Sequence, residues 1–599
     1  MGAFLKRETF SALTRKALVR DGILLIPLAA LIACSARLVR GVSCGHDFEF
    51  HLISWFETKR SWSQGVFYPH WAQTPNWGAG EPRFVFYPPI TWMLGALLGC
   101  LMSWELVPSA LTFLSLTAAG LSTRALARQF LPAPAATLAG VAAATTPYAF
   151  FSAYERTAFS ELAAAFWVPL LLLFAWRQTQ LDADRNSLLR HAFDGATAPL
   201  TLILAGTWLT NAPAGVMASY LLAFAALAAA LIHRRWWPIL RACIAMPVAL
   251  GLAAFYLIPA AWEQRWIAIQ QAVDVGMRVT DSWLFSHHSS PDLELHDQVL
   301  RIASTILVLT AGLALSGLAV SLLRRKLPRA GQPFWVPLAL LIPAIFILQL
   351  PISAPIWNLF PKLAFLQFPW RWLMVLDIPF AIFLAAATPL ESRRSRAFST
   401  LGWTAVLLLF TGLANVMFFQ VCDDEDQIGN QRTVFQAGTG VDGTDEYAAA
   451  GSDNSLIASG LPDGCLVSDP DQDLGESEAG AAPVWYPEQG SCDDTYTAQL
   501  WQSEHKILRI DGDHDGFVVL RLSRYPAWRI TVNDKAVTQK MTREDGLVAL
   551  PVPAGPSTID VRWTTTEDVI LGRWVSVVSL IVFAGLWAVE RRVRAVHLL

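Results

Sequence analysis

The chain has 599 residues, of which 54% are hydrophobic and only 16% are charged, and its mean hydropathy is +0.40. A soluble globular protein carries about 25% charged residues, so this composition excludes an ordinary soluble enzyme and indicates a polytopic membrane protein. The net charge of −3 argues against a nucleic-acid partner. None of the seven cysteines has the spacing of a structural zinc site.

The apolar stretches predict a series of membrane spans, because a spanning helix needs about 20 apolar residues. Since the first stretch is one member of this long series, we expect it to be a span and not a cleaved signal peptide. The twelve expected spans are 22–41, 107–128, 132–151, 158–176, 196–212, 213–232, 237–261, 299–323, 333–350, 370–390, 398–420 and 569–590.

The distribution of Lys and Arg orients these spans, because short basic loops stay on the cytoplasmic side. The basic clusters between the spans all fall on one side if the apolar stretch 88–104 does not cross. We therefore expect 88–104 to be a juxtamembrane helix or a re-entrant segment, and both termini to be cytoplasmic. Loops 42–106 and 262–298 and the long segment 421–568 then lie outside the cytoplasm.

The outer segment 421–568 has two parts that differ in composition. Residues 421–496 are acidic and rich in Gly and Ser, which is typical of a solvated surface, and cation binding is the alternative. From residue 505 onward, alternating apolar and polar residues between turns predict a small β-sandwich that closes onto the last span. Four cysteines lie outside, where disulfides form; Cys465 and Cys492 are one candidate pair, but the sequence does not determine the connectivity.

The motif GHDFEFH at 45–51, directly after the first span, carries the densest group of reactive side chains. It places two carboxylates and two imidazoles at the mouth of a membrane helix. In a helix that starts there, Asp47 and His51 share one face at i,i+4 spacing. A carboxylate beside an imidazole acts as a general base or binds a metal, so Asp47 and His51 are the candidate metal ligands. The alternative is a polar interfacial loop without chemistry.

Two arginines on the outer side depart from the positive-inside trend, and each needs an anionic partner. Arg156, in the loop before the fourth expected span, pairs with Glu155 or Glu161 or binds a phosphate. Arg371, in the motif FPWRW, pairs with Asp377 or binds an anionic ligand.

These motifs resemble a known family. A first span, an outer loop that opens with an Asp, a juxtamembrane stretch and a Pro-Pro element look like the GT-C glycosyltransferase fold. More narrowly, GHDFEFH, NWGAGEP, FYPP, YERTAFSE and FPWRW resemble YfhO-like bacterial membrane proteins and the related proteins labelled 6-pyruvoyl-tetrahydropterin-synthase-related. The tail RYPAWRITVNDKAVTQK resembles the closing β-module of YfhO-like chains.

The resemblance implies a multi-pass enzyme of the bacterial inner (plasma) membrane, surrounded by membrane lipids. It would have a GT-C-like catalytic module at 1–420, an extracytoplasmic domain at 421–568, and a last span with a cytoplasmic tail at 569–599. The implied reaction moves a sugar from a polyprenyl-phosphate donor to an acceptor in the cell envelope, with inversion at the anomeric carbon.

The resemblance also implies roles for individual residues. Asp47 is the expected catalytic base or metal ligand, and Glu49 is the near alternative. Dependence on a divalent metal, Mg²⁺ or Mn²⁺, stays open because the chain has Asp-x-Glu in place of Asp-x-Asp. The residues expected to bind the substrate and its phosphate are His46, His51, Arg156, Glu161 and Arg371.

Two other classes of function compete with this interpretation. A transporter or lipid-carrier flippase needs polar or broken helices near the midplane, and the sequence offers few, namely Asn211 before Pro213, and Asp377. A non-enzymatic envelope scaffold with a glycan-binding β-domain is the third class. The sequence has no Walker A, HExxH or GxSxG motif, so it does not support ATP-driven transport, zincin or serine-hydrolase chemistry.

Overall fold

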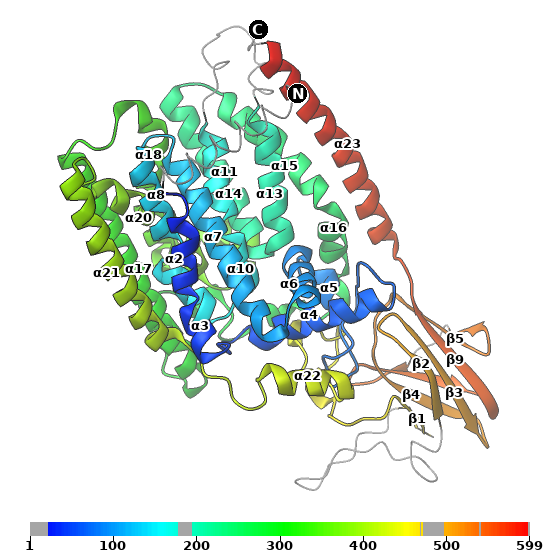
Figure 1. Cartoon of the computed structure of the whole chain (residues 1–599). Helices are drawn as coiled ribbons and strands as arrows, with labels where there is room; N and C mark the ends of the chain where they lie inside the picture. Colours follow the sequence, from blue (N-terminus) through cyan, green and yellow to red (C-terminus); the bar gives the residue numbers. More distant parts are fainter. Residues whose placement is uncertain (1–21, 178–194, 468, 471–495, 538–540, 597–599) are drawn as a thin grey trace, which may run out of the picture.

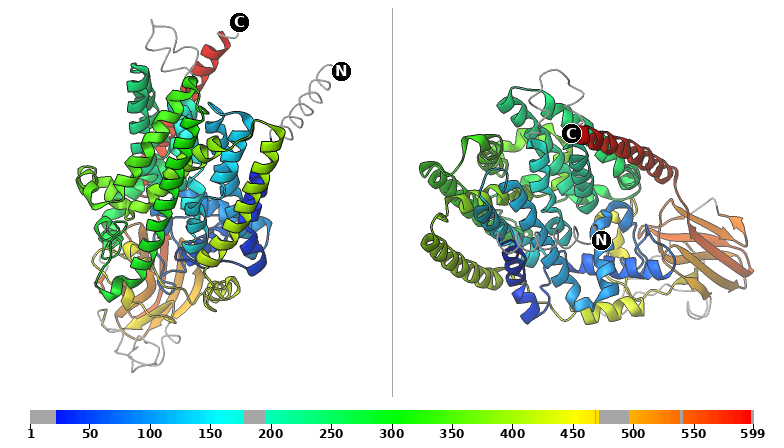
Figure 2. Two further views of the ribbon diagram at one scale, coloured as in Figure 1. Left: turned by 90° about the vertical axis from the view of Figure 1, so that its left-hand side faces the viewer. Right: turned by 45° about the horizontal axis from the view of Figure 1, so that its top comes forward.

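The computed structural model describes residues 22–177, 195–467, 469–470, 496–537 and 541–596. It has a helical body, a β-domain at one end of that body, and a last helix that returns from the β-domain along the body (Figure 1). Most helices of the body run side by side, as the second view shows (Figure 2).

The described α-helices, in chain order, are α2 (Leu25–Ala33), α3 (Ser35–Arg40), α4 (Phe48–Ser63), α5 (Arg83–Phe86), α6 (Pro89–Leu101), α7 (Val107–Ala127), α8 (Ala133–Ala143), α9 (Pro147–Phe150), α10 (Phe159–Ala164), α11 (Trp167–Trp176), α13 (Thr197–Thr210), α14 (Ala212–His233), α15 (Trp237–Leu252), α16 (Ala254–Glu263), α17 (Glu294–Leu323), α18 (Gln332–Leu348), α19 (Ala354–Leu359), α20 (Leu373–Ala387), α21 (Arg393–Phe418), α22 (Ile428–Ala437) and α23 (Glu567–Val596). A π-helix, Phe151–Glu155, lies between α9 and α10, and a 3₁₀ turn, Pro369–Trp372, precedes α20.

Eight helical stretches in the described part of the chain are long and apolar enough to cross a membrane, as judged by length and composition. They contain α7, α10 with α11, α14, α17, α18, α20, α21 and α23. A ninth stretch, α15 followed by α16, is bent by 73° at its break. The chain is thus mostly helical and consistent with a multi-pass membrane protein.

Of the twelve expected spans, nine correspond to these stretches of the described residues, counting the bent pair as one, whereas the other three contain shorter helices. The stretch 22–41 is interrupted at Cys34, between α2 and α3. In 132–151, α8 stops before Pro147, which cannot continue the helical hydrogen bonds. In 196–212, α13 has 14 residues, and the side chain of Asn211 then caps α14.

The stretch 88–104 forms α6, a short apolar helix of 13 residues. It packs on α4, and Gly95 makes the close approach: a Cβ atom there would lie 2.2 Å from the indole nitrogen of Trp55. The two helices therefore form a compact layer next to the start of α7 (Figure 1).

The β-domain consists of two antiparallel sheets that share one apolar core. The strand orders are β1-β4-β8-β7 and β2-β3-β9-β5-β6. The strand pattern predicted from residue 505 onward is confirmed. The strands are β1 (Gly464–Val467), β2 (Tyr496–Trp501), β3 (His505–Gly512), β4 (Gly516–Ser523), β5 (Trp528–Val532), β6 (Lys535–Ala536), β7 (Met541–Thr542), β8 (Leu547–Val552) and β9 (Gly555–Trp563).

The segment 42–106 and the segment after α21 are held together. A disulfide joins Cys44 to Cys422, a pair that the sequence analysis did not single out. Cys465 is also disulfide-bonded, whereas Cys492 lies outside the described residues. The backbone N–H of Thr444 donates to Glu81 at 2.9 Å, so the same loop also contacts the chain after α22.

The basic residues at the start of α21 and after α17 lie far from the segment 42–106. Helix α21 begins with a basic run and ends two residues before Gln420, whose N–H donates to Ser43 in the segment 42–106. Arg324, just after α17, donates to the carbonyl of Ala387 at the end of α20. The basic ends of α17 and α21 therefore lie at the end of the body away from the β-domain (Figure 1).

Candidate functional site

Four charged side chains from three distant segments meet at the end of the helical body that carries α4. Arg156 lies 2.8 Å from Glu161 and 3.3 Å from Asp47. The guanidinium of Arg371 lies 3.3 Å from the same carboxylate oxygen of Glu161. We call Asp47, Arg156, Glu161 and Arg371 the charge cluster. The sequence singled out all four residues, and the fold brings them together.

The backbone around Gly45 explains how Asp47 reaches Arg156. A Cβ atom on Gly45 would lie 2.1 Å from the carbonyl oxygen of Glu155, so only glycine allows this approach. The backbone N–H of Asp47 then donates to the carbonyl of Arg156 at 2.9 Å. The two segments therefore dock through their main chains, and their charged side chains leave that contact next to one another.

The segment that carries Arg156 has an uncommon backbone. It follows the π-helix Phe151–Glu155, and the β-branched Thr157 has a φ of +48°. Both features are uncommon and concentrate at functional sites. The hydroxyl of Thr157 donates to the carbonyl of Gly45 at 3.1 Å, which adds a side-chain bond to the main-chain contact.

Arg371 is fixed by its own turn. Its guanidinium donates to the carbonyl of Leu366 at 2.7 Å and lies 3.3 Å from the side-chain oxygen of Gln367. The Phe368 ring lies 5.1 Å from the guanidinium carbon of Arg371 and 5.9 Å from that of Arg156. The motif FPWRW thus supplies both a cation and an aromatic surface to the cluster.

Burial differs sharply within the charge cluster. Arg156, Glu161 and Arg371 are buried, whereas the side chain of Asp47 is 41% exposed. Burial acts to lower the pKa of Arg156, but the carboxylates of Glu161 and Asp47 raise it above its usual value. Asp47 is therefore the edge of the cluster that a molecule can reach from outside.

Neutral polar side chains continue the cluster into the body. The hydroxyl of Tyr148 donates to Glu161. The hydroxyls of Tyr87 and Ser160 lie 2.6 Å apart, and the amide of Asn211 donates to Ser160 at 3.0 Å. Sequence reasoning did not place these four residues at the site, and it noted Asn211 only as a polar position that a transporter could use. Tyr87 lies in the Pro-Pro element FYPP, but nothing in the sequence marks Tyr148.

His51 lies beneath the charge cluster, not in its open edge. Its backbone N–H donates to the carbonyl of Asp47, which confirms the helical register from Asp47 to His51. The ring is buried among Tyr87, Phe159 and Trp55, and burial lowers the pKa of His51 to about 4. Its Nε2 atom makes no hydrogen bond with the described residues.

Two other candidates of the motif point elsewhere. The carboxylate of Glu49 accepts a hydrogen bond of 2.7 Å from Gln431 in α22, and burial raises the pKa of Glu49. His46 is exposed and interacts electrostatically with Glu155. The motif therefore divides: Asp47 joins the arginines, whereas Glu49 and His46 do not.

The residues suggested as metal ligands do not assemble a ligand set. No group of three or more His, Cys, Asp or Glu side chains among the described residues is arranged to hold a metal ion. Asp47 offers one exposed carboxylate, and its nearest charged partner is the cation Arg156. Divalent metals that bind oxygen prefer several carboxylate or carbonyl ligands, so these residues do not fit Mg²⁺ or Mn²⁺ well.

The geometry resolves the pairing alternatives left open by the sequence. Arg156 pairs with Glu161, whereas Glu155 accepts a hydrogen bond from Gln420. Arg371 also pairs with Glu161, and Asp377 accepts instead from Thr146.

Comparison of the chain with protein families, with curated proteins and with solved structures finds no match.

Proposed function

We propose that the protein is a membrane glycosyltransferase of the GT-C type, which moves a sugar from a polyprenyl-phosphate donor to an envelope acceptor. One observation carries the proposal: an exposed carboxylate, Asp47, contacts the buried Arg156, which shares the carboxylate of Glu161 with a second buried arginine, Arg371. A transfer of this kind needs a base for the acceptor hydroxyl and positive charge for the departing phosphate.

In the proposed reaction, the acceptor hydroxyl approaches Asp47 from the exposed side. Its oxygen attacks the anomeric carbon, its proton passes to the Asp47 carboxylate, and the bond between the anomeric carbon and the phosphate oxygen breaks. The bonding electrons leave with the polyprenyl phosphate. Arg156 and Arg371 would hold this phosphate, and attack from the opposite face inverts the anomeric centre. No step requires a metal ion.

Asp47 is preferred over Glu49 as the base because of their partners. Asp47 contacts Arg156, which would bind the leaving phosphate, whereas Glu49 is tied to Gln431 in α22. His51 would not transfer a proton in this reaction. It is a neutral imidazole at pH 7 that packs below Asp47 and supports its position. His46 is exposed beside Glu155, away from the two arginines, so we do not propose that it binds the substrate.

We place the site on the extracytoplasmic face of a bacterial inner membrane, with both termini in the cytoplasm. Two observations support this orientation. The basic ends of α17 and α21 lie at the opposite end of the body from the charge cluster. The Cys44–Cys422 disulfide lies at the same end as the cluster and needs an oxidising compartment.

The test is transfer by the purified full-length protein in proteoliposomes, with a panel of radiolabelled polyprenyl-phosphate sugars and an envelope extract as acceptor. For any donor that the wild type uses, we expect Asp47→Asn to reduce turnover at least about a hundredfold, the usual size of a general-base contribution. Glu49→Gln is the matched control, with turnover within about twofold of wild type. Equal turnover of wild type and Asp47→Asn, at unchanged thermal stability, would refute the role of Asp47.

A transporter or flippase is the second candidate, and the broken helices favour it. The body contains a break between α8 and α9 and the 73° bend between α15 and α16. The same proteoliposomes separate the two functions. Movement of the labelled lipid between leaflets without a glycosylated product supports transport and contradicts the transferase proposal.

A further inference from the structure

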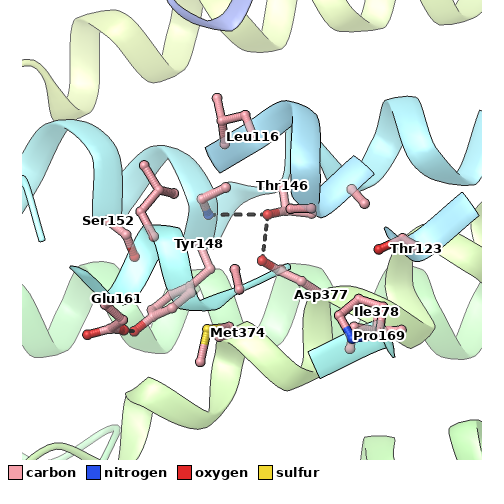
Figure 3. Close-up of a pocket in the computed structure, with 15 residues that line it drawn as sticks. Leu116, Thr123, Thr146, Tyr148, Ser152, Glu161, Pro169, Met374, Asp377 and Ile378 are labelled. Atoms are coloured by element: carbon pink, nitrogen blue, oxygen red, sulfur yellow. Dashed lines mark hydrogen bonds between the residues drawn. The ribbon is translucent and has the colours of Figure 1, made fainter. Parts of the chain in front are cut away.

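A small cavity lies inside the helical body, and its wall includes Glu161 of the charge cluster (Figure 3). It has a volume of about 30 Å³ and is lined by α7, the end of α8, α10, α11 and α20 and by the chain around α9. A single water needs about 10–15 Å³ of such volume, so the cavity admits about two or three water-sized species but no hydrated ion.

Asp377 of α20 brings a carboxylate to this cavity without a cationic partner. One carboxylate oxygen accepts from the Thr146 hydroxyl at 2.5 Å, as Figure 3 shows, and the other is buried without a hydrogen-bond partner among the described residues. No charged side chain of the described residues interacts with Asp377. The second carboxylate on the wall, Glu161, is already neutralised by Arg156 and Arg371.

A second buried group on the wall also lacks a partner. Ser152 is only 2% exposed, lines the cavity, and its hydroxyl makes no hydrogen bond with the described residues. A buried hydroxyl without a partner costs free energy unless a ligand satisfies it. The wall of the cavity therefore carries two hydroxyl groups and a carboxylate, from Ser152, Thr146 and Asp377.

The helix break beside the cavity adds main-chain oxygen. Pro147 has no N–H, so the carbonyl of Ala143, another wall residue, lacks the donor that would continue α8. Membrane proteins use such breaks to coordinate Na⁺ or H⁺, because the freed carbonyls replace the hydration shell of the ion. The break thus adds a main-chain carbonyl without its helical donor to a residue of the wall that also carries Asp377.

We propose that this cavity is a binding site for a dehydrated monovalent cation, Na⁺, with Asp377 as its charged ligand and Thr146 and Ser152 as neutral ligands. One carboxylate balances one monovalent charge, and the carboxylate and hydroxyl groups on the wall are oxygen ligands, which suit a hard cation. Through Tyr148, which lines the cavity and donates to Glu161, the ion also stabilises the buried side of the charge cluster. The site does not depend on the proposed reaction.

The test is thermal unfolding of the full-length protein in detergent, followed by tryptophan fluorescence. Solutions contain NaCl, KCl or choline chloride at equal ionic strength. Because a ligand that binds the native state stabilises it, we expect the unfolding midpoint to rise saturably with Na⁺ and little with K⁺ or choline. Equal midpoints in the three salts would overturn the proposal, as would a midpoint that follows pH but not Na⁺.

Three variants identify the site. Asp377→Asn is expected to abolish the Na⁺ response, and Asp274→Asn, in an exposed loop ion pair, is the matched control that keeps it. Should Asp377→Asn fail to fold, Ser152→Ala keeps the proposal testable. Loss of one neutral ligand, about 1 kcal/mol, is expected to raise the half-saturating Na⁺ concentration about fivefold. An unchanged Na⁺ response in Asp377→Asn or Ser152→Ala contradicts the assignment.

Discussion

At the scale of single residues, Glu161 organises the electrostatics of the site. Its carboxylate contacts both buried arginines and the Tyr148 hydroxyl. Two desolvated guanidiniums require more negative charge than one carboxylate provides, and Asp47 supplies the rest from the exposed edge. A phosphate that arrives at Arg156 therefore competes with Asp47, and its binding would release the carboxylate for work as a base.

His51 makes the stability of this region depend on pH. Burial lowers its pKa from 6.5 to about 4, so between these values the unfolded state binds a proton that the native state does not. Stability is then full above pH 6.5 and falls as the pH approaches 4, by about 3 kcal/mol for this one group. We expect His51→Phe, which keeps an aromatic ring among Tyr87, Phe159 and Trp55, to remove this part of the loss of stability at low pH.

The measurement is the unfolding midpoint of wild type and variants between pH 7.5 and pH 4. His46→Phe, which changes an exposed imidazole of the same motif, is the control and is expected to follow the wild-type curve. Identical curves for wild type and His51→Phe would show that His51 does not contribute.

At the scale of elements, the docking of residues 45–47 on residues 155–157 makes the site. We expect Gly45→Ala to destabilise the protein by about 1–3 kcal/mol, because the new methyl group meets backbone atoms that have no rotamer to change. Turnover should fall as well, since Asp47 moves away from Arg156. The measurements are the free energy of unfolding and the transfer rate.

Gly312→Ala is the matched control for Gly45→Ala. Gly312 lies within α17, where an added Cβ atom meets nothing within 4 Å. This change should leave the transfer rate unaltered and slightly favour the helix. If Gly45→Ala behaves like Gly312→Ala, the close main-chain contact has no role in positioning Asp47.

The elements differ in how well the sequence predicts them, for physical reasons. Strands β3 to β6, β8 and β9 follow from alternation and turn residues, because both signals are local. Long spans such as α14 and α17 follow from apolar length. The breaks at Cys34 and before Pro147 were missed, because composition counts apolar residues and does not show where the main chain stops being helical.

The site shows the same limit. The sequence predicts the i,i+4 relation of Asp47 and His51, since it depends only on helical geometry. It marks Arg156 and Arg371 as cations that need partners, but not that both share Glu161, because that contact joins segments about 200 residues apart. The disulfide between Cys44 and Cys422, separated by 378 residues, is hidden for the same reason.

At the scale of the whole molecule, the proposed function requires one orientation in the membrane. The charge cluster, the disulfide and the β-domain share one end of the body, and the basic ends of α17 and α21 lie at the other (Figure 1). A donor that is flipped to the outer leaflet reaches the cluster only if this end is extracytoplasmic. The orientation of the protein in the membrane can therefore be measured as a test of the proposed function, even before the sugar is known.

We expect a membrane-impermeant maleimide to label Lys535→Cys, in the exposed hairpin of β5 and β6, in intact cells. Arg394→Cys, exposed at the start of α21, should react only after permeabilisation. Both changes are made in a chain whose exposed free cysteines, Cys100 and Cys243, are replaced by serine, and that chain alone gives the background. The reverse pattern would place Asp47 on the cytoplasmic side, where a donor in the outer leaflet cannot reach it.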